Sequence, residues 1–233
     1  MADKWLVFGG WGMDAGLLRP LFGDSSIYVD VNPLMPSLLN GATLRPDWGC
    51  IVEREYAREF KATGRIAGWS TGAIVACSLA KRVRTSKMVL LSATPSFCRR
   101  EGFRFGWKPG VLVAMRERLA VPHNTVLGDF VAAAGLPPDY AGRAVYSADT
   151  LIAGLVFLEQ ACLLNIASTV SCPSFVLHGN RDEIVPHQAG AALARSMGAQ
   201  FRLVDGGHAF FAGWGRGKID RLLDDSLRGR YVL

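Results

Sequence analysis

The chain has 233 residues, of which 50% are hydrophobic and 20% are charged. This length and balance predict one globular domain with a large core and exclude an intrinsically disordered or fibrous protein. The formal net charge of +6 suggests an acidic partner or simply a soluble basic surface. However, the basic residues are scattered and no nucleic-acid-binding motif accompanies them, so we expect no nucleic acid partner.

The first apolar run and the spacing of the cysteines bear on the compartment and on cofactors. The first apolar run, residues 5–8, is too short for a signal-peptide core or a membrane span, so we expect a cytoplasmic protein without a membrane partner. We also expect a monomer. The cysteines show no metal-type spacing, which predicts free, buried or partly buried thiols and no metal or organic cofactor. They are Cys50, Cys77, Cys98, Cys162 and Cys172.

Short apolar runs alternate with helical patterns in the first part of the chain, which predicts an α/β fold with a mainly parallel sheet. We predict residues 30–47 to be irregular because they contain three prolines. The expected strands are 5–8, 26–29, 65–69 and 88–92, and the expected helical segments are 17–22, 50–62 and 71–83.

The pattern changes after residue 94, where about 70 residues offer helices and no convincing strand. We therefore predict a helical lid at 95–169, inserted into a core formed by 1–94 and 170–233. Helices are expected at 111–119, 125–134 and 150–164. The core then resumes with strands at 173–178 and 200–204 and helices at 187–197 and 218–227.

A candidate nucleophile lies between the strand at 65–69 and the helix that follows it. In Gly68-Trp69-Ser70-Thr71-Gly72 the glycines permit a sharp turn that exposes the Ser70 hydroxyl at the carboxyl end of a strand. The helix N-terminus beside Ser70 can stabilise an oxyanion.

A serine of this kind needs a base and an acid that orients the base. Asp182 directly follows the strand at 173–178 and is our candidate acid, and His208 directly follows the strand at 200–204 and is our candidate base. Asp205 is the alternative acid, although an aspartate in a turn more often binds local backbone N–H groups. The other histidines fit a strand end, a helix start and a lid loop; they are His178, His187 and His123.

The backbone N–H of Thr71 and an N–H from the loop after the first strand, best supplied by Trp11, are the candidate oxyanion hole. The rings of Trp11 and Trp69 flank the serine and are expected to wall an apolar acyl slot. Ordinary core packing is the alternative role for both tryptophans.

Four segments together resemble the α/β-hydrolase family over nearly the whole chain: 9–12, 68–72, 179–186 and 206–208. The order Ser70, Asp182, His208 is that family's order. The early Gly-Trp-Gly and the Gly-Trp-Ser, with a softer likeness at 151–173, are similar to pimeloyl-[acyl-carrier protein] methyl ester esterases of biotin synthesis, the BioH type. The family commonly has His-Gly where this chain has Phe8-Gly9-Gly10, and we expect its two N-terminal antiparallel strands to be missing here.

The resemblance implies a serine carboxylesterase that frees the carboxylate of methyl-pimeloyl carried on acyl carrier protein, without a cofactor. It also implies that lid arginines dock the acidic carrier. Between residues 99 and 118, six basic residues face two acidic ones, and the candidates for docking are Arg99, Arg100 and Arg104; a solvated surface is the alternative.

Two other functions stay open. One is a broad carboxylesterase or thioesterase for small acyl esters, and the other is a non-catalytic homologue that binds a ligand under the lid.

Overall fold

The structure, a computed structural model, describes residues 4–121, 125–142, 146–165, 170–215 and 217–227. Its strands are β1 Leu6–Phe8, β2 Ile27–Val29, β3 Leu39–Asn40, β4 Thr43–Leu44, β5 Arg65–Trp69, β6 Lys87–Leu91, β7 Ser174–Gly179 and β8 Gln200–Val204. Its α-helices are α1 Arg19–Phe22, α2 Trp48–Thr63, α3 Thr71–Ala80, α4 Pro109–Leu119, α5 Val126–Ala133, α6 Ala148–Gln160, α7 His187–Met197 and α8 Lys218–Leu227. Within the described residues, the 3-10 helices are η1 Ala15–Leu18, η2 Asn32–Leu38 and η3 Pro138–Gly142.

A six-stranded sheet in the order β2-β1-β5-β6-β7-β8 forms the centre of the molecule. Every pairing within it is parallel, so the predicted α/β architecture is confirmed. The chain runs outward from β1 to β2 and then returns to the other side of β1, so the strand order reverses between β1 and β5. Ligands bind outside the carboxyl ends of strands at such a switch point, which is where Ser70 lies.

Helices cover both faces of this sheet. One buried cluster joins the sheet to α2, α3 and α7 through side chains such as Val52, Ile74 and Leu193. A second cluster, on the other face, includes Phe22 of α1 and Leu223 of α8. Helices of parallel sheets pack in this way because both faces of such a sheet are apolar.

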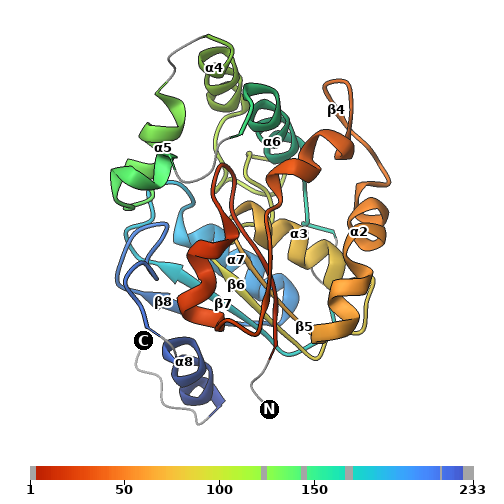
Figure 1. Cartoon of the computed structure of the whole chain (residues 1–233), viewed down its shortest axis with the longest axis vertical. Coiled ribbons are helices and arrows are strands. Elements are labelled where there is room, and N and C mark those ends of the chain that lie inside the picture. The colour runs from red at the N-terminus through yellow and green to blue at the C-terminus, as the bar shows by residue number, and fades with distance from the viewer. Residues whose placement is uncertain (1–3, 122–124, 143–145, 166–169, 216, 228–233) are drawn as a thin grey trace.

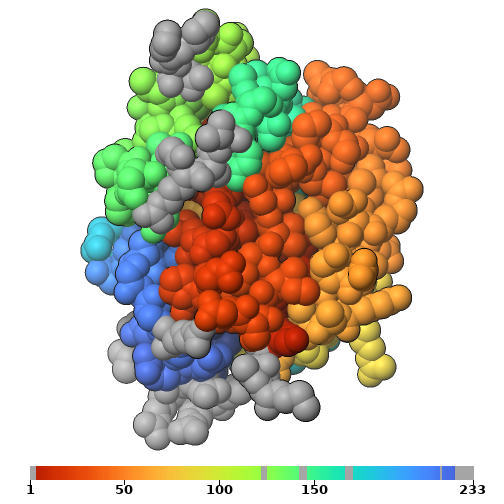
Figure 2. All heavy atoms as spheres, in the orientation of Figure 1, coloured from red at the N-terminus to blue at the C-terminus, as the bar shows by residue number. Residues whose placement is uncertain are grey.

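Helices α4, α5 and α6 lie together beyond one end of the sheet, at the top of the view, and α8 lies at the opposite end (Figure 1). In the space-filling view the green and turquoise atoms of these three helices form the upper end of the molecule, next to the red N-terminal segment (Figure 2). The predicted helices at 111–119, 125–134 and 150–164 correspond to α4, α5 and α6, although α6 ends earlier, at Gln160.

The prediction for residues 30–47 was wrong. This segment contains η2, which tolerates Pro33 at its start and Pro36 within it, and a two-stranded antiparallel sheet formed by β3 and β4. Gly41 connects the two strands with a φ of 58°. The side chain of Gln160 fastens this small sheet to α6, because its Oε1 accepts from Leu44 N and its Nε2 donates to Ala42 O.

All five cysteines are free, and Cys50 is exposed, whereas we expected the thiols to be buried or partly buried. Among the described residues, no helix has the length and apolar character needed to cross a membrane.

Candidate active site

Ser70 lies in the turn between β5 and α3, with a φ of 56° and a ψ of −119°. Such a backbone conformation is strained for a residue with a side chain and is found where function requires it. The turn is tight because the glycine at 72 lets two backbones touch. A Cβ at Gly72 would lie 2.3 Å from the carbonyl oxygen of Gly9, so only glycine fits.

Asp182 and His208 form a buried pair at the carboxyl ends of β7 and β8. His208 Nδ1 lies 2.8 Å from Asp182 Oδ2, and both side chains are 0% exposed. Burial acts to raise the pKa of Asp182, but the nearby His208, hydrogen bonds from both His178 and His208, and the N–H of Val185 together hold this pKa well below its ordinary value. The carboxylate is therefore ionised at neutral pH and can orient the imidazole.

The alternative acid, Asp205, points elsewhere. Its two oxygens accept from the guanidinium of Arg181 at 2.5 and 3.2 Å, and both side chains are more than 60% exposed. His187 is the first residue of α7, as predicted. His123 lies outside the described residues.

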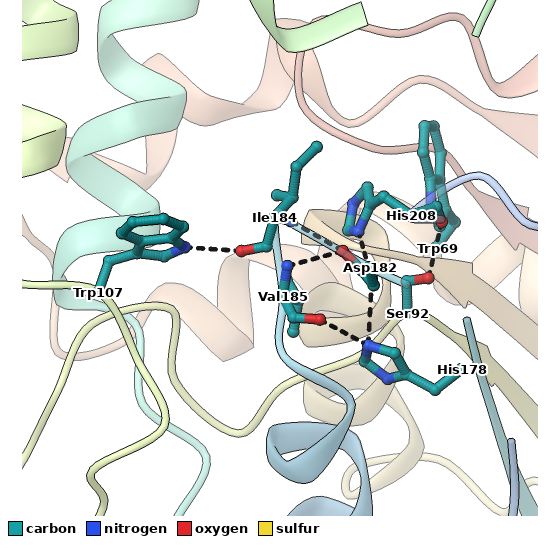
Figure 3. Close-up of polar contacts among 8 residues, drawn as sticks. All are labelled: Trp69, Ser92, Trp107, His178, Asp182, Ile184, Val185 and His208. Atoms are coloured by element: carbon teal, nitrogen blue, oxygen red, sulfur yellow. Dashed lines mark hydrogen bonds and ion pairs between the residues drawn. The ribbon is translucent and has the colours of Figure 1, made fainter. Parts of the chain in front are cut away.

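The backbone of His208 is held by residues at the ends of β5 and β6. Its carbonyl oxygen accepts from Trp69 Nε1 at 3.1 Å and from Ser92 Oγ at 2.7 Å (Figure 3). The residue before Ser70 in the chain thus contacts the candidate base directly. His208 Nε2 is buried and has no hydrogen-bond partner among the described residues, so this nitrogen is available to a nearby hydroxyl.

The loop after β1 lies across the switch point from Ser70. Asn32, which is 1% exposed, fastens this loop: its Oδ1 accepts from Gly12 N at 2.8 Å and its Nδ2 donates to Gly10 O at 3.2 Å. Trp11 lies within the fastened loop, and Thr71 is the first residue of α3. Both predicted oxyanion-hole residues therefore belong to segments that border the Ser70 turn.

A cavity of about 270 Å³ lies between Ser70 and the helices α4, α5 and α6. Apart from a few charged groups its walls are apolar, and each of α4, α5 and α6 contributes to them. The lining residues are Trp11, Ser70, Phe97, Trp107, Val111, Leu112, Met115, Arg118, Val126, Asp129, Phe130, Ala133, Leu155, Leu158, Glu183 and Ile184.

The two tryptophans expected to wall an acyl slot lie differently with respect to this cavity. Trp11 lines the cavity, and its Nε1 donates to Leu151 O of α6. Trp69 is absent from the lining, because it points to the opposite face of β5, where its ring packs against His208 and Phe211. Its role here is to support His208.

The candidate docking arginines occupy different surroundings. Arg99 and Arg104 are exposed, whereas Arg100 is partly buried and donates to the backbone carbonyl of Glu159 on α6. Arg118 bridges α4 to α5 through an ion pair with Asp129 at 2.5 Å. Next to these charges, Trp107 and Val111 at the cavity wall are each 39% exposed.

Sequence reasoning missed three residues around this site, Asn32, Ser92 and Trp107, and it assigned His178 to a strand end without its contact to Asp182. Asn32 and Ser92 each lie just beyond the end of a strand at the functional edge of the sheet, which is a usable signal. Trp107 offers none, because its hydrogen bond to the Ile184 carbonyl depends on how segments distant in the sequence pack together. No group of His, Cys, Asp or Glu side chains able to hold a metal ion occurs in the described part of the chain.

Comparison with known proteins points to one family. A model of the "Alpha/beta hydrolase family" matches residues 8–213. A pimeloyl-[acyl-carrier protein] methyl ester esterase of Nitrosomonas europaea is 31% identical over 149 residues, which are 54% of this chain and 55% of that protein. The match to this relative thus spans about half of its length. A protein of the same name from Vibrio campbellii is 26% identical over 88% of this chain and 87% of its own.

Among solved structures, an esterase from Exiguobacterium antarcticum superposes with a TM-score of 0.72 at 14% identity, covering 97% of this chain and 91% of that one. At this level of identity the likeness bears on the fold alone.

Proposed function

The chain belongs to the alpha/beta hydrolase family, and from this we propose that it is a serine carboxylesterase that hydrolyses the methyl ester of pimeloyl-acyl carrier protein in biotin synthesis. The observation that carries the proposal is the buried Asp182–His208 pair, 2.8 Å apart, at the sheet edge where the strained Ser70 faces an apolar cavity.

The proposed reaction follows from these positions. His208 Nε2 takes the proton of Ser70 Oγ as this oxygen attacks the ester carbonyl, and Asp182 stabilises the imidazolium that forms. The N–H groups of Trp11 and Thr71 stabilise the oxyanion of the tetrahedral intermediate. His208 then protonates the departing methanol, which leaves an acyl-enzyme on Ser70. Water, activated by His208, releases the free carboxylate and restores the serine.

Two features support a carrier-bound acyl substrate. The cavity walls are mainly apolar, which suits a methylene chain. The exposed Arg99 and Arg104 lie in a basic segment close to the exposed Trp107 of the cavity wall, a combination suited to an acidic protein that delivers an acyl group. The names of the curated relatives agree with this substrate.

The experiment that tests the proposal compares hydrolysis of methyl pimeloyl-acyl carrier protein with hydrolysis of free dimethyl pimelate, with Ser70→Ala as the blank. We expect a strong preference for the carrier-bound ester and a loss of about 10⁴-fold or more in the variant. Full activity of Ser70→Ala would refute the assignment of the nucleophile.

A broad esterase for small acyl esters is the second candidate. The apolar lining favours it, because apolar walls select a chain by size more than by functional group. Comparable rates on the two esters would identify this function. A folded protein that is inactive on both would indicate a ligand-binding homologue.

A further inference from the structure

A second histidine contacts the carboxylate of Asp182. His178, the fifth residue of β7, places its Nε2 3.1 Å from Asp182 Oδ2, the same oxygen that His208 Nδ1 approaches. The two imidazoles lie on opposite sides of the carboxylate (Figure 3). His178 is 0% exposed, and neither the proposed reaction nor the cavity uses it.

The surroundings of His178 determine which of its nitrogens carries hydrogen. Its Nε2 also lies 2.8 Å from the backbone carbonyl of Val185, so both neighbours of this nitrogen are acceptors and Nε2 must be the donor. Its Nδ1 is buried without a hydrogen-bond partner among the described residues. It faces Gly190 of α7, where a Cβ would lie only 2.2 Å from Nδ1.

The Nε2–H of His178 therefore fastens both ends of one short loop. The loop begins at Asp182 and reaches α7 within five residues. At its start, Asp182 Oδ1 accepts from the N–H groups of Ile184 and Val185 at 2.9 and 2.8 Å. The other oxygen, Oδ2, is left to the two histidines. One rigid, buried ring thus sets the rotation of the carboxylate and the path of the backbone beside it.

We propose that His178 is a positioning residue for the acid: its Nε2–H holds Asp182 Oδ2 and the Val185 carbonyl at once, so that the carboxylate stays aligned with His208 Nδ1. This inference rests on the proposed serine esterase function. Without the ring, the carboxylate loses one of four donors, and the Val185 carbonyl is left buried without a partner, which allows the loop to shift.

The first test compares His178→Phe, which keeps a ring and removes the donor, with His178→Gln, whose side-chain N–H can replace it. We expect His178→Phe to lower kcat by about 10-fold to 100-fold, the effect of one hydrogen bond to a charged group. KM should change little, because His178 does not line the cavity. His178→Gln should recover most of the rate, and His187→Gln, at the start of α7, is the matched control. A folded His178→Phe with the wild-type kcat would overturn the proposal.

The second test uses the wild-type protein and does not depend on any variant folding. In ¹⁵N-histidine spectra we expect hydrogen on Nε2 of His178 and a low-field proton on Nδ1 of His208. Hydrogen on Nδ1 of His178 with none on Nε2 would overturn the proposal. If the wild type hydrolyses no ester, the proposed function fails, and these spectra still decide whether His178 supports Asp182.

Discussion

The indole N–H of Trp107 donates a 2.6 Å hydrogen bond to the backbone carbonyl of Ile184. That carbonyl belongs to the same peptide group as the N–H of Val185, which donates to Asp182 Oδ1. A single peptide group, between Ile184 and Val185, therefore connects Trp107 of the cavity wall to the candidate acid Asp182 (Figure 3).

This link predicts separate effects of the ring and its N–H group. Trp107→Phe keeps most of the cavity wall and removes the hydrogen bond, so we expect kcat to fall about fivefold, the value of one neutral hydrogen bond, with little change in KM. Trp107→Ala should also raise KM because the wall is lost. Steady-state kinetics on one ester measure both. Trp5→Phe, at the opposite edge of the sheet, is the control, and an equal loss there would contradict the prediction.

The lowered pKa of Asp182 predicts how stability depends on pH. Its folded-state pKa lies below the ordinary value of 3.8, so the ionised carboxylate stabilises the folded state above that value, and this contribution is lost as the pH falls from there toward the folded pKa. We expect Asp182→Asn to be less stable than wild type at pH 7 and this difference to shrink below about pH 4. Urea unfolding at a series of pH values measures it. A difference that stays constant down to pH 3 would contradict this linkage.

Asn32 should affect both stability and turnover. Asn32→Ala leaves Gly12 N and Gly10 O without their buried partner, so we expect a loss of about 1–3 kcal/mol in the free energy of unfolding. Because the loosened loop contains Trp11, kcat should fall about 10-fold if this loop supplies an oxyanion donor. Denaturant unfolding and initial rates test the two effects. Asn40→Ala, exposed on β3, is the control, and an unchanged kcat in Asn32→Ala would remove the loop from the proposed mechanism.

Charge reversal tests the docking of a carrier protein. We expect Arg99→Glu combined with Arg104→Glu to raise KM for a carrier-bound ester, more strongly at low salt, and to leave KM for a free ester unchanged. Arg58→Glu is the control, because Arg58 is exposed on α2, outside the basic segment 99–118, and its substitution changes the charge by the same amount as each of the two test substitutions. The docking role would be refuted by equal changes in KM for the two substrates.

Several helix and strand boundaries of the α/β core were predictable because neighbouring residues in the sequence mark them. Proline precedes α7 and glycine follows it, and both bounds of this helix and of β8 agree with the prediction. The Ser70 turn and the strand-end positions of Asp182 and His208 were likewise readable, because parallel strands bring their carboxyl ends to one edge.

The remaining features depend on contacts between distant segments. The cavity walls come from helices whose mutual packing no local pattern encodes. We expected Trp69 beside an acyl slot, but side chains alternate along a strand, and its ring packs within a buried cluster: Ala67 and Trp69 share one cluster, and Ile66 belongs to the other. The small β3–β4 sheet consists of two-residue strands, too short for an alternating pattern to show.

Gly72 lies against the backbone at the end of β1. This contact distinguishes two kinds of substitution, those near the Ser70 turn and those in the cavity wall. The Ser70 turn and the end of β1, from which the Trp11 loop starts, touch through main-chain atoms, and α4, α5 and α6 take no part in this contact. Residues 97–158, in contrast, supply most of the cavity surface. Side chains of the cavity wall on α4, α5 and α6 can therefore be exchanged without altering this contact, whereas a larger residue at Gly72 would disturb the Ser70 turn and the end of β1 together.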